Sequence, residues 1–242
     1  MIGTLARHAA AAFAAFFVGT GDADAKPSTP APPKPVNEAA RAEGEKLIAG
    51  AGAPDLFLNE TRDGAILIRH KASNFQCLFN PGGENALLVA TDEPRGDEIG
   101  CDGPTMLFHT TYFIKRAGDE DSLDASYEHA VEEVKARWPK AMNIKVAPDA
   151  NQEVLTKLAE TAPPSKTSWF LAKNGESWAF TRVSVAKVGD WLVTMRAAGP
   201  VESQDAAESL TEMLWLTRLM VMVDPALGPK PLVAAQGGQK KR

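Results

Sequence analysis

Two short turn signals constrain the fold of this chain more than any other feature. Asn174-Gly175 and Gly189-Asp190 are two-residue sequences that favour tight hairpin turns, and each lies between runs rich in apolar and β-branched residues. They predict an antiparallel meander of three strands from Thr167 to Ala198. The cross-strand pairs expected around a loop at Asn174-Gly175 are Lys173 with Glu176, Leu171 with Trp178 and Trp169 with Phe180.

The remaining apolar pattern predicts helices and strands joined mostly by short turns. Helical spacing and boundary residues predict four helices, at Glu38–Ala49, Leu123–Trp138, near Gln152–Thr161 and at Asp205–Val221, the last capped by Asp205 or Ser203. Short β-rich runs predict strands at Ala65–Lys71, Phe75–Asn80, Ala86–Ala90, Thr105–Lys115 and Met142–Ala147, with an acidic loop over Thr91–Asp102. We therefore expect an α+β fold, an antiparallel meander sheet with helices packed on one face.

The N-terminus predicts export. Arg7 precedes the apolar run Ala9–Val18, and Ala23-Asp24-Ala25 supplies small residues at a cleavage point, so residues 1–25 are predicted to be a signal peptide. The run is shorter than the ~20 residues that a bilayer-spanning helix needs. No cysteine lies at the cleavage point that could carry a lipid anchor. A periplasmic or secreted protein is therefore expected, with no transmembrane segment in the mature chain.

Export changes the interpretation of the two cysteines, because an oxidising compartment favours their pairing. A bridge between Cys77 and Cys101 would close a loop of about 25 residues. By reducing the entropy of the unfolded chain, it would stabilise the fold by roughly 3.5 kcal/mol. The alternatives are two free buried thiols or a zinc site completed by His70 and His109. The sequence lacks the closely spaced ligand pairs that are typical of zinc sites, so we expect a disulfide and no metal.

One folded domain is expected between two irregular segments. Residues 26–36 (KPSTPAPPKPV) contain five prolines and predict an extended spacer. Residues 225–242 carry proline, glycine and a basic end without periodicity, which predicts a disordered tail. The single α+β domain is therefore expected over residues 37–224.

The order of these elements resembles the Mog1/PsbP-like fold over roughly residues 60 to 223. The resemblance is carried by a hairpin-rich sheet, the helix opening Ser122-Leu123-Asp124-Ala125-Ser126-Tyr127, a meander of three strands and a closing helix. Members of that fold are mostly binding or assembly factors and not enzymes. The resemblance implies the same kind of role here, as a fold analogy.

No arrangement of residues in the sequence predicts catalysis. A strained serine elbow, a phosphate-binding glycine loop and the H-E-x-x-H motif are all absent. His70 ends one predicted strand and His109 lies inside another, positions typical of structural residues, and both are kept as candidates for a ligand pocket. The carboxylates of Asp92–Asp102 and Asp119–Asp124 lack the alternating spacing of a calcium loop, so weak calcium binding stays only an alternative.

The aromatic residues of the meander could form a binding surface or pack in the core. Trp169, Trp178 and Trp191 could bind sugar rings or a partner protein if exposed, but packing beneath the helices is the expected arrangement.

These observations predict an exported, non-catalytic envelope protein that acts as a protein-binding or assembly module. Its expected partner is another envelope protein, and it needs no cofactor. The net charge of −5 and the absence of a polybasic stretch in the folded domain argue against nucleic acid as a partner. The alternative is a periplasmic small-ligand binder or hydrolase with a pocket between the sheet and the C-terminal helix, where His70 or His109 would be the polar group.

Overall fold

The computed structural model describes residues 38–62, 64–105, 107–145 and 152–228 of the chain. All of them fall in one compact unit. The predicted signal peptide (1–25) and spacer (26–36) lie outside the described residues, as does most of the predicted tail. Within that tail, Pro225–Leu227 form a short 3-10 helix, η3, directly after the last α-helix.

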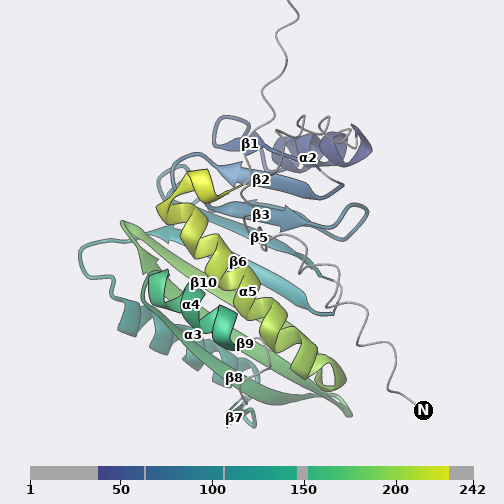
Figure 1. The fold of residues 1–242 in the computed structure, drawn as a ribbon, viewed down its shortest axis with the longest axis vertical. Coiled ribbons are helices and arrows are strands. Elements are labelled where there is room, and N and C mark those ends of the chain that lie inside the picture. Colours follow the sequence, from purple (N-terminus) through teal and green to yellow (C-terminus); the bar gives the residue numbers. More distant parts are fainter. Residues whose placement is uncertain (1–37, 63, 106, 146–151, 229–242) are drawn as a thin grey trace, which may run out of the picture. The chain divides into compact units, whose positions relative to one another are not determined.

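Two antiparallel sheets form the centre of this unit (Figure 1). The smaller sheet has the order β1-β2-β3 and contains β1 (Phe57–Asn59), β2 (Ile66–His70) and β3 (Gln76–Phe79). The larger sheet has the order β4-β5-β6-β10-β9-β8-β7. Its strands are β4 (Ala86–Val89), β5 (Glu98–Pro104), β6 (His109–Arg116), β7 (Met142–Ile144), β8 (Ser165–Asn174), β9 (Ser177–Val188) and β10 (Trp191–Pro200). The predicted α+β class, with antiparallel strands and helices packed on a sheet, is confirmed.

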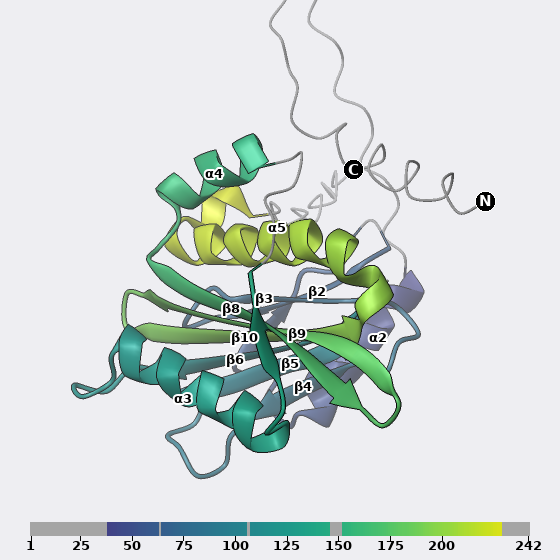
Figure 2. The ribbon, with the colours of Figure 1, turned by 90° about the horizontal axis from the view of Figure 1, so that it is seen from below.

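The helices divide between the two faces of the larger sheet instead of sharing one (Figure 2). The described α-helices are α2 (Glu38–Gly50), α3 (Leu123–Arg137), α4 (Gln152–Thr161) and α5 (Gln204–Val223), with a 3-10 turn, η2 (Val201–Ser203), before α5. On β9, Val183 and Val185 pack beneath α3, whereas Arg182 and Ser184 point to the opposite side. Polar residues on alternate positions normally indicate a solvent face, but here α5 covers this side of the strand, and Arg182 donates a hydrogen bond to Thr211 of α5. We refer to the two sides as the α3 face and the α5 face.

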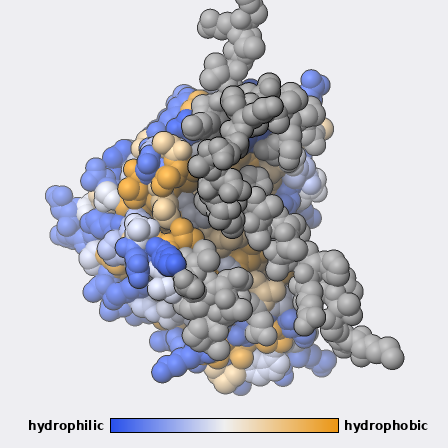
Figure 3. Space-filling view, in the orientation of Figure 1, coloured by the Kyte–Doolittle hydropathy of each residue, from blue (hydrophilic) through white to orange (hydrophobic). Residues whose placement is uncertain are grey.

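Hydrophobic side chains gather on the surface over the C-terminal end of α5 (Figure 3). Two of the exposed apolar residues of the described chain belong to this end: Val223 is 63% exposed and Leu227 of η3 is 58% exposed. An exposed apolar patch can mark a binding surface, so this patch is an alternative to any binding site on the α3 face.

Two strands lie where the sequence predicted none. β1 precedes the first predicted strand, and β5 includes the last five residues of the segment Thr91–Asp102, so the expectation of an acidic loop is wrong for Glu98–Asp102. β5 contains glycines, which are uncommon in strands, so the sequence did not predict a strand there. A Cβ built on Gly100 would lie 3.1 Å from the Tyr112 carbonyl oxygen, so the close approach of β6 favours glycine at this position.

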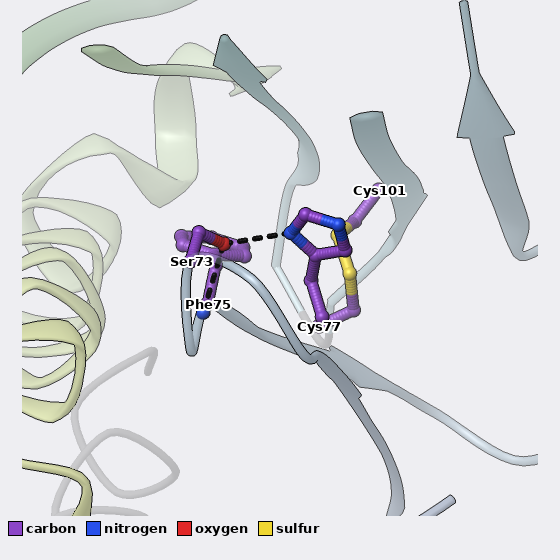
Figure 4. The surroundings of a disulfide bond; sticks show 5 residues. Ser73, Phe75, Cys77 and Cys101 are labelled. Atoms are coloured by element: carbon purple, nitrogen blue, oxygen red, sulfur yellow. Dashed lines mark hydrogen bonds between the residues drawn. A yellow bond between two sulfur atoms is a disulfide. The ribbon is translucent and has the colours of Figure 1, made fainter. Parts of the chain in front are cut away.

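β3 and β4 follow one another along the chain but belong to different sheets and do not pair. Cys77 of β3 and Cys101 of β5 form a disulfide between the two sheets, with Cα atoms 5.8 Å apart (Figure 4). The predicted disulfide is confirmed. A zinc site built from the same two cysteines is wrong, because both thiols are consumed in the bridge.

The first hairpin is present, but its register differs from the predicted one. Asn174 pairs with Ser177, Lys173 with Trp178, Leu171 with Phe180 and Trp169 with Arg182. The turn residues are therefore Gly175 and Glu176, one position later than expected. Gly175 has φ +63° and Glu176 is not among the residues with positive φ, a combination that identifies a type II′ turn in place of type I′.

Replacing Gly175 with valine is expected to lower the free energy of unfolding by about 1–3 kcal/mol. No atom lies within 4 Å of a Cβ built on Gly175, so the cost comes from the positive φ alone. The matched control is Glu176→Val, which places the same side chain at the neighbouring turn position without positive φ. Urea unfolding should separate the two variants by at least about 1 kcal/mol, and equal midpoints would argue against the turn geometry.

Candidate functional site

An open groove lies on the α3 face of the larger sheet, and we call it the α3 groove. Helix α3 packs against β8, β9 and β10, so it covers only part of this face. A hollow of about 750 Å³ follows the flank of α3, where Val134 and Trp138 meet side chains from the sheet. A second cavity in the described part of the chain, of about 230 Å³, is smaller.

The groove crosses the strands, because its lining residues come from six neighbouring strands of one face. Asp102 of β5 pairs with Thr111 of β6, and Thr111 pairs with Arg196 of β10. Leu88 of β4 lines one end and Ala172 of β8 the other. Five inter-strand spacings separate β4 from β8, which gives a length of roughly 24 Å. That length accommodates seven or eight residues of an extended chain.

The walls of the groove are exposed to solvent, which distinguishes it from an enclosed ligand cavity. Leu88 is 41% exposed, and the side chains of His109 and Glu133 are 49% and 43% exposed. Small ligands are usually held in cavities that bury most of their surface. A shallow channel with apolar and charged walls is better suited to a ligand that lies along it.

A cluster of three polar side chains occupies one end of the groove. His109 Nε2 lies 2.9 Å from Asp102 Oδ1, and the Thr111 hydroxyl donates a short hydrogen bond to the same carboxylate oxygen. The carboxylate thus stands between the imidazole and the hydroxyl.

A second charged pair joins the helix to the sheet across the groove. Glu133 of α3 accepts a hydrogen bond from Arg196 of β10, whose guanidinium carbon lies 5.7 Å from the centre of the Phe113 ring. Arg196 Nε is buried and has no acceptor among the described residues. A buried donor without an acceptor costs roughly 1–3 kcal/mol.

The two histidines predicted as pocket residues do not share a site. His109 lines the α3 groove, as described above. His70 is fully buried on the opposite face, where its ring lies 5.5 Å from Phe57 and 5.6 Å from Trp191. Trp191 pairs with Arg116, seven positions along β6 from His109, a separation of roughly 23 Å.

The surroundings of His70 fit a structural role. Its Nδ1 lies 2.9 Å from the Ser73 hydroxyl, which also accepts a hydrogen bond from the Phe75 amide beside the disulfide (Figure 4). Burial lowers the pKa of His70 to about 4, and the nearby Arg116 adds to this effect. The imidazole is therefore neutral at pH 7 and is held within the core between the two sheets.

Stability should fall as the pH drops from 6.5 toward 4 because of His70. The unfolded chain binds a proton with a pKa near 6.5, whereas the folded chain binds it only near pH 4, so the unfolded state binds more protons in this interval. The expected loss approaches about 3 kcal/mol by pH 4. Urea unfolding at pH 7 and pH 4.5 should show a smaller loss for His70→Gln than for the natural chain. Parallel losses would contradict the assignment.

A smaller cavity of about 230 Å³ lies near the predicted pocket between the sheet and the C-terminal helix. It is lined by residues of α4 and α5 and by Trp169, and neither His70 nor His109 contributes to it.

Of the three tryptophans considered in the meander, Trp169 and Trp191 are 8% and 7% exposed, as expected for core residues, whereas Trp178 is 42% exposed.

The sequence did not indicate the buried cation beneath α5. Arg182 is fully buried, donates hydrogen bonds to Ser184 and Thr211, and forms an ion pair with Glu212 of α5. Burial lowers the pKa of its guanidinium, and Glu212 opposes that shift. The available signal was the polar pair Arg182 and Ser184, two positions apart within an apolar strand, but this pattern has the same form as that of a solvent-facing strand.

Two further properties of the described residues concern metal ions and membranes. No group of three or more potential ligand side chains in residues 38–62, 64–105, 107–145 and 152–228 could hold a metal ion. None of the helices described there has the length and apolar character needed to cross a membrane.

Comparison with known proteins gives no family assignment: no protein-family model matches the chain, and no curated protein matches it either.

Proposed function

We propose that this chain is a non-catalytic binding module of the bacterial envelope, whose α3 groove binds an extended segment of another envelope protein. The observation that carries the proposal is the groove itself: an open channel of roughly 24 Å with apolar side chains along its floor and charged pairs at its walls. The resemblance to the Mog1/PsbP-like fold also supports a binding role, as a fold analogy.

The chemistry of the walls favours a polypeptide over a smaller ligand. Leu88 of β4 and Phe113 of β6 offer apolar contacts at two points of the channel, and Arg196 of β10, the next strand after β6, offers a guanidinium donor. An extended chain presents side chains and backbone carbonyls in alternation, so it can occupy the apolar points and reach the donor at once. The carboxylates of Asp102 and Glu133 and the cation of Arg196 would then select the sequence.

The compartment is part of the proposal. The predicted signal peptide directs the chain out of the cytoplasm, and the Cys77–Cys101 disulfide is typical of a protein that folds in an oxidising environment. We propose a periplasmic or secreted location, with cleavage after Ala25 and a mature chain that begins at Lys26.

Selection from a library of displayed 12-residue peptides tests the binding function. Peptides enriched on the mature chain are expected to lose at least about tenfold in affinity when Leu88 is replaced by glutamate, because the substitution puts a charge on the apolar floor. The matched control is Leu78→Glu. Leu78 is an exposed strand leucine of the smaller sheet, with 45% exposure against 41% for Leu88, and it does not line the groove.

Circular dichroism and thermal unfolding of both leucine variants should resemble those of the natural chain, since both side chains are exposed. The proposal fails if no peptide is enriched. It also fails if Leu88→Glu and Leu78→Glu affect binding equally.

A further inference from the structure

We infer that α5 and the sheet beneath it form a binding site for a small monovalent anion, held by the side chains of Arg218, Trp215 and Tyr112. This anion site is separate from the α3 groove, because α5 lies on the opposite side of the larger sheet from α3 (Figure 2). It does not depend on the proposed function. The inference starts from a buried cation to which the described residues give no negative partner.

Arg218 of α5 is that cation, and its side chain is only 7% exposed. In the described part of the chain no carboxylate forms an ion pair with it, and its buried Nε has no hydrogen-bond acceptor. Burial lowers the pKa of Arg218, but a guanidinium starts from so high a value that it stays charged at pH 7. Burying an unpaired charge is costly, so the fold needs a counter-charge at this point.

Arg182 shows how the same side of the sheet satisfies another buried cation. It is fully buried, forms an ion pair with Glu212 of α5, and donates hydrogen bonds to the hydroxyls of Ser184 and Thr211. Glu212 lies six residues before Arg218, roughly 9 Å away along the helix axis, and its carboxylate is already paired. The partners of Arg182 therefore do not neutralise Arg218.

Two more donors belong to the same region. Trp215 precedes Arg218 by three residues, so the two side chains are neighbours on the surface of α5. Trp215 is fully buried, and its Nε1 also has no acceptor among the described residues. Tyr112 of β6 interacts electrostatically with Arg218. Burial raises the pKa of Tyr112, so its phenol is neutral at pH 7 and can donate a hydrogen bond without neutralising the cation.

The chemistry of these three side chains favours an anion. A guanidinium and an indole N–H can only donate hydrogen bonds, and the phenol O–H can donate a third. An anion accepts all of them and also supplies the missing negative charge, which makes each hydrogen bond stronger than one to a neutral acceptor.

Close packing restricts the anion to a small one. Trp215 and Leu219 are fully buried, and the Phe75 and Tyr112 rings lie 5.3 Å apart. Side chains packed in this way favour an ion of the size of chloride over an organic ligand. The small exposed fraction of Arg218 gives such an ion access from solvent without unfolding of the core.

Thermal unfolding of the mature chain in chloride tests the inference. The reference is sodium gluconate at the same ionic strength, because its anion is too bulky for the site. With a Kd of about 10 mM, chloride at about 200 mM should raise the Tm by roughly 5 °C. Arg218→Met removes the cation and should abolish this rise. The matched control is Arg41→Met, which removes an exposed arginine from α2 and should retain it.

Equal changes in Tm for the natural chain and Arg218→Met would indicate a general salt effect and overturn the inference, as would a natural chain that does not respond to chloride. Crystals of the natural chain grown in sodium bromide give a second readout that does not depend on the variants. An anomalous peak is expected within hydrogen-bonding distance of the Arg218 guanidinium and Trp215 Nε1. A water molecule at that position, or no peak there, would also overturn the inference.

Discussion

Replacing Glu212 with alanine is expected to lower the free energy of unfolding by about 3–5 kcal/mol. The substitution removes the carboxylate that forms an ion pair with Arg182 and leaves a fully buried cation beneath α5 without this partner. The hydrogen bonds that Arg182 donates to the Ser184 and Thr211 hydroxyl oxygens would remain, but neutral acceptors do not compensate for the lost charge. For a domain of this size the corresponding decrease in Tm is roughly 10 °C.

Two further variants separate the effect of the buried charge from that of a lost side chain. Glu132→Ala removes an exposed glutamate from α3 and should change stability by less than about 0.5 kcal/mol. The double replacement of Arg182 by methionine and Glu212 by leucine removes both charges and should recover most of the loss. If the double variant is as unstable as Glu212→Ala, the uncompensated charge is not the cause.

Reduction of the Cys77–Cys101 disulfide is expected to lower the free energy of unfolding by roughly 3.5 kcal/mol. The bridge joins residues separated by 24 positions and connects the two sheets, so its loss frees the unfolded chain and also unlinks β3 from β5. Urea unfolding of the mature chain with and without dithiothreitol measures the difference. The paired variant Cys77→Ala with Cys101→Ala should be insensitive to dithiothreitol, and an equally insensitive natural chain would contradict the prediction.

The positions of helices and strands could be predicted from the sequence more accurately than the pairing of the strands. Helix α4 and the strands β2, β3 and β4 lie where apolar periodicity placed them, because that periodicity reflects which face of each segment is buried. The division of those strands into two sheets could not be predicted, since local patterns do not encode which neighbour a strand accepts. The predicted hairpin register is wrong for a related reason. The sequence around Asn174-Gly175 also permits a turn whose first residue is Gly175, and a turn shifted by one residue changes every cross-strand pair.

The candidate site was the least predictable part of the molecule. His109 was selected as a pocket residue, and it lines the α3 groove together with Asp102, a residue that the sequence assigned to a loop. Their proximity follows from pairing between β5 and β6, and β5 was not predicted. Arg196 and Glu133 are 63 positions apart and meet only because α3 crosses β10. Export and the location remain predictions, because residues 1–25 lie outside the described chain.

The central claim is that the α3 groove, and not the apolar patch at the end of α5, binds an extended polypeptide. The most direct test is an NMR titration of the chain that begins at residue 37 with a library-selected peptide. We expect the largest amide shift changes at Leu88, Thr111 and Ala198, with Val223 and Leu227 unchanged. Shift changes confined to Val223, Leu227 and their neighbours, or no shift changes at any peptide concentration, would contradict the account.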